Sequence, residues 1–260
     1  GPKTVIGVFP ADHQITPRRQ FASAVETASR ASYEQDSIVT FGIRPKFAST
    51  GYGYINYREE KAEEFCGSSV FEVEKFTEKP DRRQAEAFLE EGAYLWNSGM
   101  FFWRLSTFIN KLQDANPEMT AKTEKITKAL QNNDQEQADK HFQALEDISI
   151  DYALMERTSE ILVTPANFEW DDVGSWDALD RTYPHDEKEN VSIGAPVVID
   201  SERCIVYNEP GAQDMAVSVV GMTDTVVVVS KDGILVVPKD KSQDVKKAVR
   251  ELRDRKAEQL

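Results

Sequence analysis

The chain has 260 residues, of which 40% are hydrophobic and 29% are charged, and its formal net charge is −14 at pH 7. This size and balance are typical of a soluble globular protein with one large domain, or with a large and a small one. The acidic charge argues against non-specific binding to nucleic acid or to anionic membranes, and no apolar run approaches the length of a membrane span.

The two cysteines, Cys66 and Cys204, lie far apart in the sequence. Two such thiols form neither a disulfide framework nor a zinc-ligand set. We therefore expect a protein of the reducing cytoplasm.

Residues 1–183 alternate between predicted strands and predicted helices. Apolar or alternating runs predict strands at Thr4–Phe9, Ser37–Ile43, Tyr54–Tyr57, Ser69–Thr77, Tyr94–Arg104 and Ile161–Pro165. Helical spacing and end signals predict helices at Thr16–Ala31, Asp81–Glu91, Ser106–Leu145, Ser149–Arg157 and Trp176–Arg181. The near-continuous apolar run at Thr4–Phe9 is typical of an interior strand of a parallel sheet, whereas Tyr54–Tyr57 is expected to be exposed.

Turn residues interrupt two of these elements. The helical stretch Ser106–Leu145 is expected to break near Asn116-Pro117 and again at Asn132–Asp134. The strand Tyr94–Arg104 is expected to contain a turn at Asn97–Gly99.

Beyond a polar linker at 183–190, the composition shifts to short Val- and Ile-rich runs. They predict strands at Ala195–Asp200, Cys204–Tyr207, Ala216–Val220, Thr225–Ser230 and Gly233–Pro238. The fairly regular spacing is typical of a small sandwich or a short β-helix. A charged helix is expected at Asp240–Arg255, with Ser242 as a possible N-cap. The predicted domains are therefore residues 1–183 and residues 190–260.

The stretch Phe168–Trp176 places Asp171 and Asp172 between two tryptophans. Adjacent carboxylates repel unless a cation or separate partners hold them, so one interpretation is half of a metal site. The other is a loop in which Asp172 or Ser175 caps the following helix.

Two shorter motifs also allow two interpretations. Asp12 and His13 follow the first predicted strand, at the end where α/β sheets bind ligands, yet Asp12 also suits a helix cap and His13 a structural hydrogen bond. Gly51 and Gly53 alternate with tyrosines in Thr50–Ile55. They suit either a turn or a backbone that a ligand approaches closely.

Two polar pairs lie at other predicted strands. Glu78-Lys79 suits either a surface ion pair or a carboxylate for hydroxyl groups beside an ammonium for a phosphate. Asn97, next to Trp96, suits either core packing with a turn or an amide that holds a sugar.

Together and in this order, these motifs resemble the mannose-1-phosphate guanylyltransferases (GDP-mannose pyrophosphorylases) of the sugar-nucleotide transferase superfamily. The combination of Thr50–Ile55, Trp96–Phe101 and Asp172–Trp176 carries the resemblance, which continues to Ser242–Lys247. The resemblance implies an α/β fold, with a Rossmann-like nucleotide-diphospho-sugar transferase layer followed by a small, left-handed β-helix-like domain and a C-terminal helix. It also implies a homodimer formed through the β domain.

The resemblance implies a reaction in which mannose 1-phosphate attacks the α-phosphorus of GTP, giving GDP-mannose and pyrophosphate. It assigns catalytic roles to three residues: Asp12 and Asp172 as ligands of Mg²⁺, and Lys79 as the cation that holds the sugar phosphate. Asp171 has no role in this scheme and is expected to be structural.

The same resemblance assigns the mannose contacts. Glu78 and Asn97 are expected to bind its hydroxyl groups, the backbone of Gly53 to touch the sugar, and Gly51 to assist. The expected partners are therefore mannose 1-phosphate and GTP, with neither nucleic acid nor membrane.

One departure from the family pattern bears on activity. The family opens with a glycine-rich loop that carries an Arg and a Lys and cradles the triphosphate, whereas this chain begins at the strand before Asp12. We expect such a chain alone to bind mannose 1-phosphate and Mg²⁺ with little or no GTP turnover, and to expose an apolar sheet edge. The alternative function is a non-catalytic sugar-phosphate-binding or dimerisation fragment.

Overall fold

The computed structural model describes residues 1, 3–212 and 214–257. These residues form two compact units, the first made of 1–11 with 15–170 and the second of 12–14 with the segment from 171 onward. The domain bounds expected from the sequence stay a prediction, because compact units and domains need not share a boundary. Within the described residues, no helix is long and apolar enough to cross a membrane.

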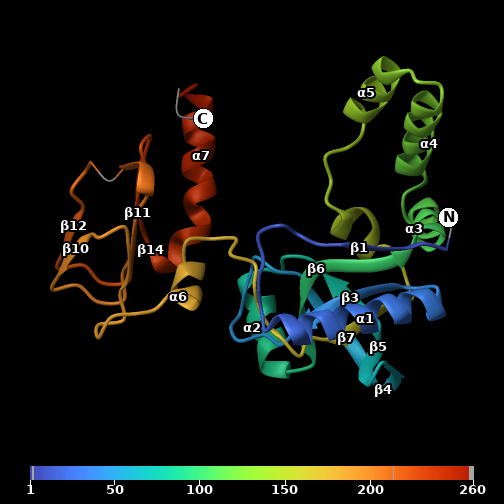
Figure 1. Ribbon diagram of the computed structural model, residues 1–260, viewed down its shortest axis with the longest axis horizontal. Coiled ribbons are helices and arrows are strands. Elements are labelled where there is room, and N and C mark those ends of the chain that lie inside the picture. Colours follow the sequence, from blue (N-terminus) through green and yellow to red (C-terminus); the bar gives the residue numbers. More distant parts are fainter. Residues whose placement is uncertain (2, 213, 258–260) are drawn as a thin grey trace. The chain divides into compact units, whose positions relative to one another are not determined.

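The first unit is built on a mixed six-stranded sheet (Figure 1). Its strands are β1 (Val5–Val8), β3 (Ile38–Ile43), β4 (Tyr54–Phe65), β5 (Ser68–Thr77), β6 (Tyr94–Arg104) and β7 (Ile161–Pro165). Their order is β1-β6-β3-β7-β5-β4, and β4 also pairs with β6. The β3–β7 pair is parallel, and the other pairs are antiparallel. A separate two-stranded pair joins β2 (Gln14–Thr16) to β8 (Glu169–Asp171).

The expectation that Thr4–Phe9 is an interior parallel strand is wrong for the described sheet, where β1 is an edge strand antiparallel to β6. Its apolar pattern has a different origin. Ile6 packs into the cluster on one face of the sheet, while Phe9 contacts Phe102 on the other, with ring centroids 5.4 Å apart. Val8 and Phe9 nevertheless remain exposed, so the apolar run revealed neither the edge position of β1 nor its antiparallel pairing.

The helices of this unit are α1 (Arg18–Gln35), α2 (Arg82–Glu91), α3 (Leu105–Ala115), α4 (Pro117–Gln131), α5 (Gln135–Gln143) and η1 (Asp151–Met155). Of these, α1 packs on one face of the sheet and η1 with α3 on the other. The expected helix breaks are confirmed, because the side chains of Asn116 and Asp134 cap α4 and α5. The short helix expected at Ser149–Arg157 is also present, but η1 is a turn of π-helix.

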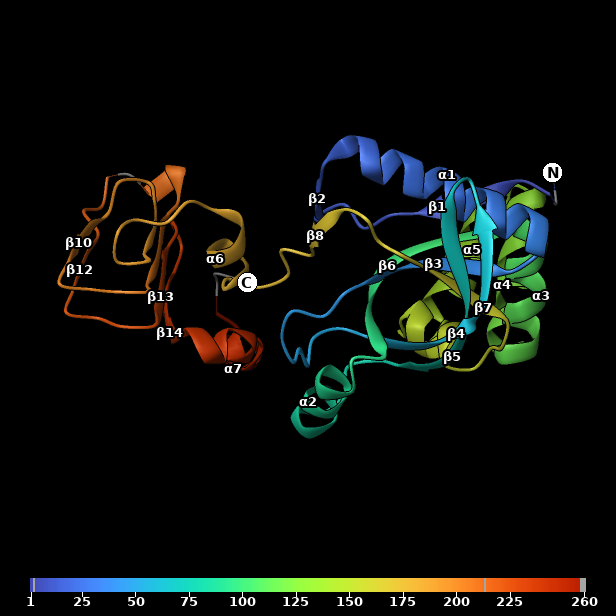
Figure 2. The same cartoon turned by 90° about the horizontal axis from the view of Figure 1, so that it is seen from below.

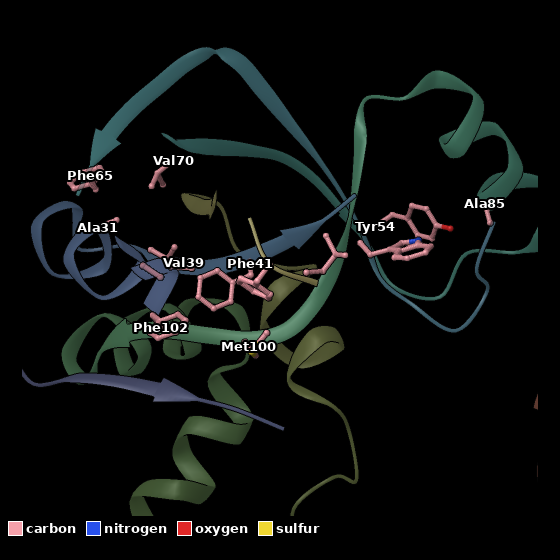
Figure 3. Close-up of a cluster of buried hydrophobic side chains, with 14 residues drawn as sticks. Ala31, Val39, Phe41, Tyr54, Phe65, Val70, Ala85, Met100 and Phe102 are labelled. Atoms are coloured by element: carbon pink, nitrogen blue, oxygen red, sulfur yellow. The ribbon is translucent and has the colours of Figure 1, made fainter. Parts of the chain in front are cut away.

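Strand alternation sends β3 side chains to two different clusters. Val39 and Phe41 pack with Phe102 and the alanines of α1, so α1 lies along one face of the sheet (Figures 2 and 3). Ile38 faces the other way, into a cluster with Phe101 of β6 and the buried residues of η1. This second cluster fixes η1 against the sheet.

The strand β4 differs from its prediction in length and burial. Tyr54 and Ile55 are fully buried, so the expectation of an exposed strand is wrong. The strand also continues to Phe65 through a charged stretch without apolar alternation, which gave no strand signal. Cys66 and Gly67, both with positive φ, close the hairpin between Phe65 and Ser68 as a two-residue turn.

The turn expected at Asn97–Gly99 is wrong. The strand β6 continues through this segment, and its register against β3 shifts there. Gly99, with φ of 70°, adopts the left-handed conformation that the register shift requires, as in a β-bulge with a left-handed glycine. Bulges re-aim side chains, which matters for Asn97.

The second unit is β-helix-like. Its strands are β9 (Val191–Ile193), β10 (Val197–Ile199), β11 (Ile205–Asn208), β12 (Ser218–Val220), β13 (Thr225–Val229) and β14 (Ile234–Pro238). From β9 to β13 the chain alternates between two sheets, and each strand pairs in parallel with the one two places along. This arrangement is that of a β-helix rather than a sandwich, and β14 closes it as an antiparallel strand. Its handedness stays a prediction.

Three helical segments complete this unit: α6 (Ala178–Thr182), η2 (Pro210–Ala212), and η3 (Lys239–Asp244) leading into α7 (Val245–Asp254). The expectation that Ser242 caps the last helix is wrong. Its hydroxyl donates to Asp177 instead, and α7 begins at Val245 without a side-chain cap.

Candidate functional site

Three strand segments of the first unit converge on Gly53, Glu78 and Asn97. Gly53 directly precedes β4, Glu78 directly follows β5, and Asn97 lies in β6. The register pairs Tyr54 with Thr77 on one side and with Trp96 on the other, so the three residues are neighbours. The Asn97 N–H also donates to the Gly53 carbonyl at 2.8 Å. The sequence motifs that carry Gly53, Glu78 and Asn97 therefore meet in space.

Gly53 leaves room for the two side chains beside it. A Cβ at this position would collide with Oε2 of Glu78 and would lie 3.2 Å from Cβ of Asn97. A side chain at Gly53 would therefore displace the Glu78 carboxylate, whereas the φ of Gly53 places no demand for glycine.

Glu78 and Lys79 place opposite charges side by side. The Lys79 ammonium lies 3.0 Å from Oε1 of Glu78, and the Glu78 side chain is only 6% exposed. Burial, together with the charge of Asp151, raises the pKa of Glu78 against the opposing effect of Lys79. Oε2 of Glu78 is buried and has no hydrogen-bond partner among the described residues, so it is available as an acceptor.

The Lys79 side chain remains half exposed. Burial acts to lower its pKa, but the hydrogen bond and charge of Glu78 outweigh this effect and raise it. The backbone of Lys79 has φ of 46°, a left-handed conformation that costs energy for a side chain with Cβ. Its N–H donates to the Tyr52 carbonyl at 3.2 Å, which holds this turn in place.

Asn97 is buried and hydrogen-bonded at both ends of its amide. Its Oδ1 lies 3.2 Å from the N–H of Gly99 and 3.2 Å from the Thr40 hydroxyl. Its Nδ2 donates to Oδ1 of Asp151 at 3.0 Å. Burial raises the pKa of Asp151, despite opposing hydrogen bonds.

Aromatic rings lie beside this group. The ring of Tyr52 contacts Trp96 at 4.9 Å and Trp170 at 5.3 Å between centroids. The ring of Phe47 contacts Trp96 at 4.8 Å. Aromatic side chains were expected here from the motifs around Gly53 and Asn97. Gly51 lies in the same loop, and its N–H donates a hydrogen bond to the Ser49 hydroxyl. The role of Gly51 in binding stays a prediction.

The acids of the other motifs belong to the second unit. Burial lowers the pKa of His13, and the carboxylates of Asp12, Asp172 and Asp171 oppose this shift. The negative charges of Asp12 and Asp172 are therefore both felt at His13, and their role as metal ligands stays a prediction. Gly174 makes room for Asp172, since a Cβ there would lie 2.6 Å from its Oδ2.

Asp171 and Asp172 have different surroundings. Asp171 accepts two hydrogen bonds from the Arg181 guanidinium, one of them at 3.2 Å, so its expected structural role fits the geometry. The capping alternatives are wrong, because neither α1 nor α6 has a side-chain cap bond at its N-terminus. The Ser175 hydroxyl donates to Asp177 instead.

Comparison with known protein families gives two matches along the chain. The family described as nucleotidyl transferase matches residues 2–189. The chain belongs to the nucleotidyl transferase family. Residues 194–252 match the β-helix domain described as mannose-phosphate isomerase/GMP-like, in agreement with the alternating parallel strands of the second unit.

Curated relatives of this nucleotidyl transferase carry specific names. A mannose-1-phosphate guanylyltransferase of Escherichia coli K12 is 38% identical over 95% of this chain and 51% of its own length. The alginate biosynthesis protein AlgA of Pseudomonas aeruginosa PAO1 is 38% identical over 94% of this chain and 50% of its own length. The chain thus spans about half the length of the curated relatives it matches.

A solved structure from Thermus thermophilus, described as mannose-1-phosphate geranyltransferase, has the same fold. It superposes with a TM-score of 0.76 at 31% identity, covering 96% of this chain and 70% of that one. The expected fold class, an α/β nucleotidyltransferase layer followed by a β-helix-like domain and a C-terminal helix, is confirmed.

Members of the nucleotidyl transferase family commonly use a divalent metal. Within the described residues, no three His, Cys, Asp or Glu side chains form a metal cluster. Magnesium is usually bound by only one or two carboxylates together with substrate phosphates. A pair of acids such as Asp12 and Asp172 fits that requirement.

Three residues of this site were missed from the sequence. Asp151 and Thr40 hold the Asn97 amide, and Glu156 accepts the Glu78 N–H at 2.8 Å. Thr40 lies within a buried strand and carries no signal. The acid before the apolar run of η1 is the one feature that points to Asp151.

Proposed function

We propose that the protein transfers a guanylyl group from GTP to mannose 1-phosphate, giving GDP-mannose and pyrophosphate. One observation carries the proposal: the Glu78 carboxylate has its Oε1 3.0 Å from the Lys79 ammonium, its Oε2 is buried without a partner among the described residues, and both it and Asn97 adjoin Gly53. An acceptor and a donor suit the hydroxyl groups of a neutral sugar, and the ammonium suits its phosphate. The names of the relatives support mannose 1-phosphate as that sugar phosphate.

The proposed chemistry needs little acid–base help. An oxygen of the sugar phosphate, already an anion, attacks the α-phosphorus of GTP, and the bond between the α-phosphorus and its bridging oxygen breaks as pyrophosphate leaves. The protein therefore acts by positioning and by neutralising phosphate charge. In this scheme Lys79 binds the sugar phosphate, while Glu78, Asn97 and the backbone of Gly53 orient the mannose ring.

We assign the divalent cation to Mg²⁺, with Asp12 and Asp172 as its protein ligands. The cation would neutralise phosphate charge during transfer. Support comes from the oxygen-only donor pair and from the space that Gly174 leaves for Asp172.

Titration calorimetry of this chain with mannose 1-phosphate tests the proposal. Lys79→Ala should weaken binding by about tenfold to a hundredfold, since hydrogen bonds to charged groups are worth roughly 1.5–3 kcal/mol. Lys75→Ala removes an exposed lysine of β5, the strand that ends before Lys79, and should leave the affinity unchanged. Absence of binding by the unaltered chain, or unchanged binding by Lys79→Ala, would reject the proposal.

In a longer protein that contains this chain, Asp172→Asn should abolish GDP-mannose formation.

We further propose a cytoplasmic homodimer that pairs through the β-helix-like domain. Its surface carries exposed apolar side chains, namely Val197, Ile199, Val220, Ile234 and Val236. Light scattering should give twice the chain mass, and Ile234→Lys should reduce it to one chain. A monomeric unaltered chain would contradict this.

A purely non-catalytic fragment is not favoured, because the relatives are named as transferases.

A further inference from the structure

The Asn97 amide has one compatible orientation. Its Oδ1 accepts the Gly99 N–H, and its Nδ2 donates to the Asp151 carboxylate. A flipped amide would set two donors against each other at Gly99 and two acceptors against each other at Asp151. In the observed orientation Oδ1 also faces the Thr40 hydroxyl, so the amide has one N–H left for a ligand.

We propose that Asp151 is a positioning residue that locks the Asn97 amide as a hydrogen-bond donor and so determines which sugar epimer is bound. This rests on the proposed function, because it concerns the same sugar site. Asn97 then donates to a hydroxyl oxygen, while the buried Oε2 of Glu78 accepts from a hydroxyl proton. Such a donor–acceptor pair fixes the directions of the hydroxyl groups, which is what distinguishes sugar epimers.

The cost of burying Asp151 supports a functional role. Its side chain makes no salt bridge within the described part of the chain, and its hydrogen-bond partners include the Asn97 amide. Even a partly buried carboxylate is unfavourable without an ion-pair partner, and such groups gather at functional sites.

The π-helical turn explains how Asp151 is held. Ala153, Leu154 and Met155 of η1 are buried, and the last two pack in the cluster that contains Ile38 and Phe101. Core packing therefore fixes the position of Asp151 at the start of the turn. Glu156, directly after the turn, accepts the Glu78 N–H. One short segment thus holds the Asn97 side chain and the backbone of Glu78.

Titrations with mannose 1-phosphate and with glucose 1-phosphate, which differ at the 2-hydroxyl group, test this inference. The unaltered chain should prefer mannose 1-phosphate. Asp151→Ala should weaken its binding about tenfold and bring the two affinities together, because one oriented hydrogen bond is lost. Asp151→Asn keeps an acceptor oxygen and should retain the preference. Asp147→Ala, an exposed acid before the same turn, is the matched control.

The outcomes separate this inference from the proposed function. Failure of the unaltered chain to bind either sugar phosphate would reject the function, whereas normal affinity and preference in Asp151→Ala would reject the positioning role. NMR of the ligand-free chain gives a further readout, with Asn97→Asp identifying the side-chain amide signals. These signals should shift in Asp151→Ala and stay in place in Asp147→Ala; unmoved signals in Asp151→Ala would overturn the inference. If Asp151→Ala does not fold, Asp151→Ser, whose hydroxyl is too short to reach Asn97, replaces it.

Discussion

Replacing Gly53 by alanine tests whether close packing at this glycine shapes the sugar site. The added Cβ would overlap Oε2 of Glu78 and would lie 3.3 Å from the Phe76 ring. The ring and the strands around it cannot move freely, so the Glu78 carboxylate must be displaced. The substitution therefore acts on the acceptor that we assign to the sugar.

The magnitude follows from two effects. Overpacking by one methyl group in a packed site costs about 1–3 kcal/mol of stability. Displacing the Glu78 acceptor removes a hydrogen bond to a charged group, about 1.5–3 kcal/mol, which corresponds to roughly tenfold to hundredfold weaker binding. Gly211→Ala is the control, because its added Cβ would meet no heavy atom within 4 Å.

Urea unfolding and titration calorimetry measure the two effects. In a Glu78→Ala background the overlapping carboxylate is gone, so Gly53→Ala should then cost less than about 1 kcal/mol of stability. A double-mutant cycle isolates this coupling. If Gly53→Ala costs the same stability in both backgrounds, the overlap with Glu78 is not its cause and the reasoning is refuted.

Three further predictions concern stability. Asp171→Asn should cost about 1–2 kcal/mol, since it weakens a partly buried ion pair with the arginine of α6, and should cost more than Asp172→Asn in urea unfolding; equal costs would contradict the structural assignment. Phe41→Ala should cost about 3–5 kcal/mol, because Phe41 is fully buried, and a loss under about 1 kcal/mol would be inconsistent with this core. The pKa of Glu78 and that of Asp151 are raised, chiefly by burial, so their ionisation destabilises the fold as the pH rises from the ordinary carboxyl range to the raised values. The double variant Glu78→Gln/Asp151→Asn should therefore have a higher melting temperature than the unaltered chain at about pH 8 but not at about pH 4. An equal difference in melting temperature at both pH values would contradict the raised pKa values.

Several features of the fold could be predicted from the sequence, because they depend on the chemistry of residues close together in the chain. Asn116 and Asp134 mark helix starts, and their side chains make the cap bonds that this predicts. Regularly spaced valine-rich runs indicated the small β domain, although β9, which directly follows the polar linker, was missed.

Other features could not be predicted from the sequence, because they depend on contacts with residues far away in the chain. The charged part of β4 is a strand only because β5 pairs with it, and no alternation in β4 itself reveals this. Asn97 lies at the end of a bulge and not in a turn, because β3 pairs with β6 on both sides of the irregularity. Asp151 acquires its role only through the amide that lies across from it.

The sequence by itself determined the chemical types of the candidate residues: a carboxylate and an ammonium at Glu78-Lys79 and an amide at Asn97 in the first unit, and two acids at Asp12 and Asp172 in the second. Residue types and their order are given by the sequence itself, and a family resemblance rests on them directly. The tertiary structure alone decided that Gly53, Glu78 and Asn97 adjoin, and that Asp151 fixes the amide. The physical reason is that hydrogen-bond direction and close packing depend on strand register, which partners far apart in the chain set together.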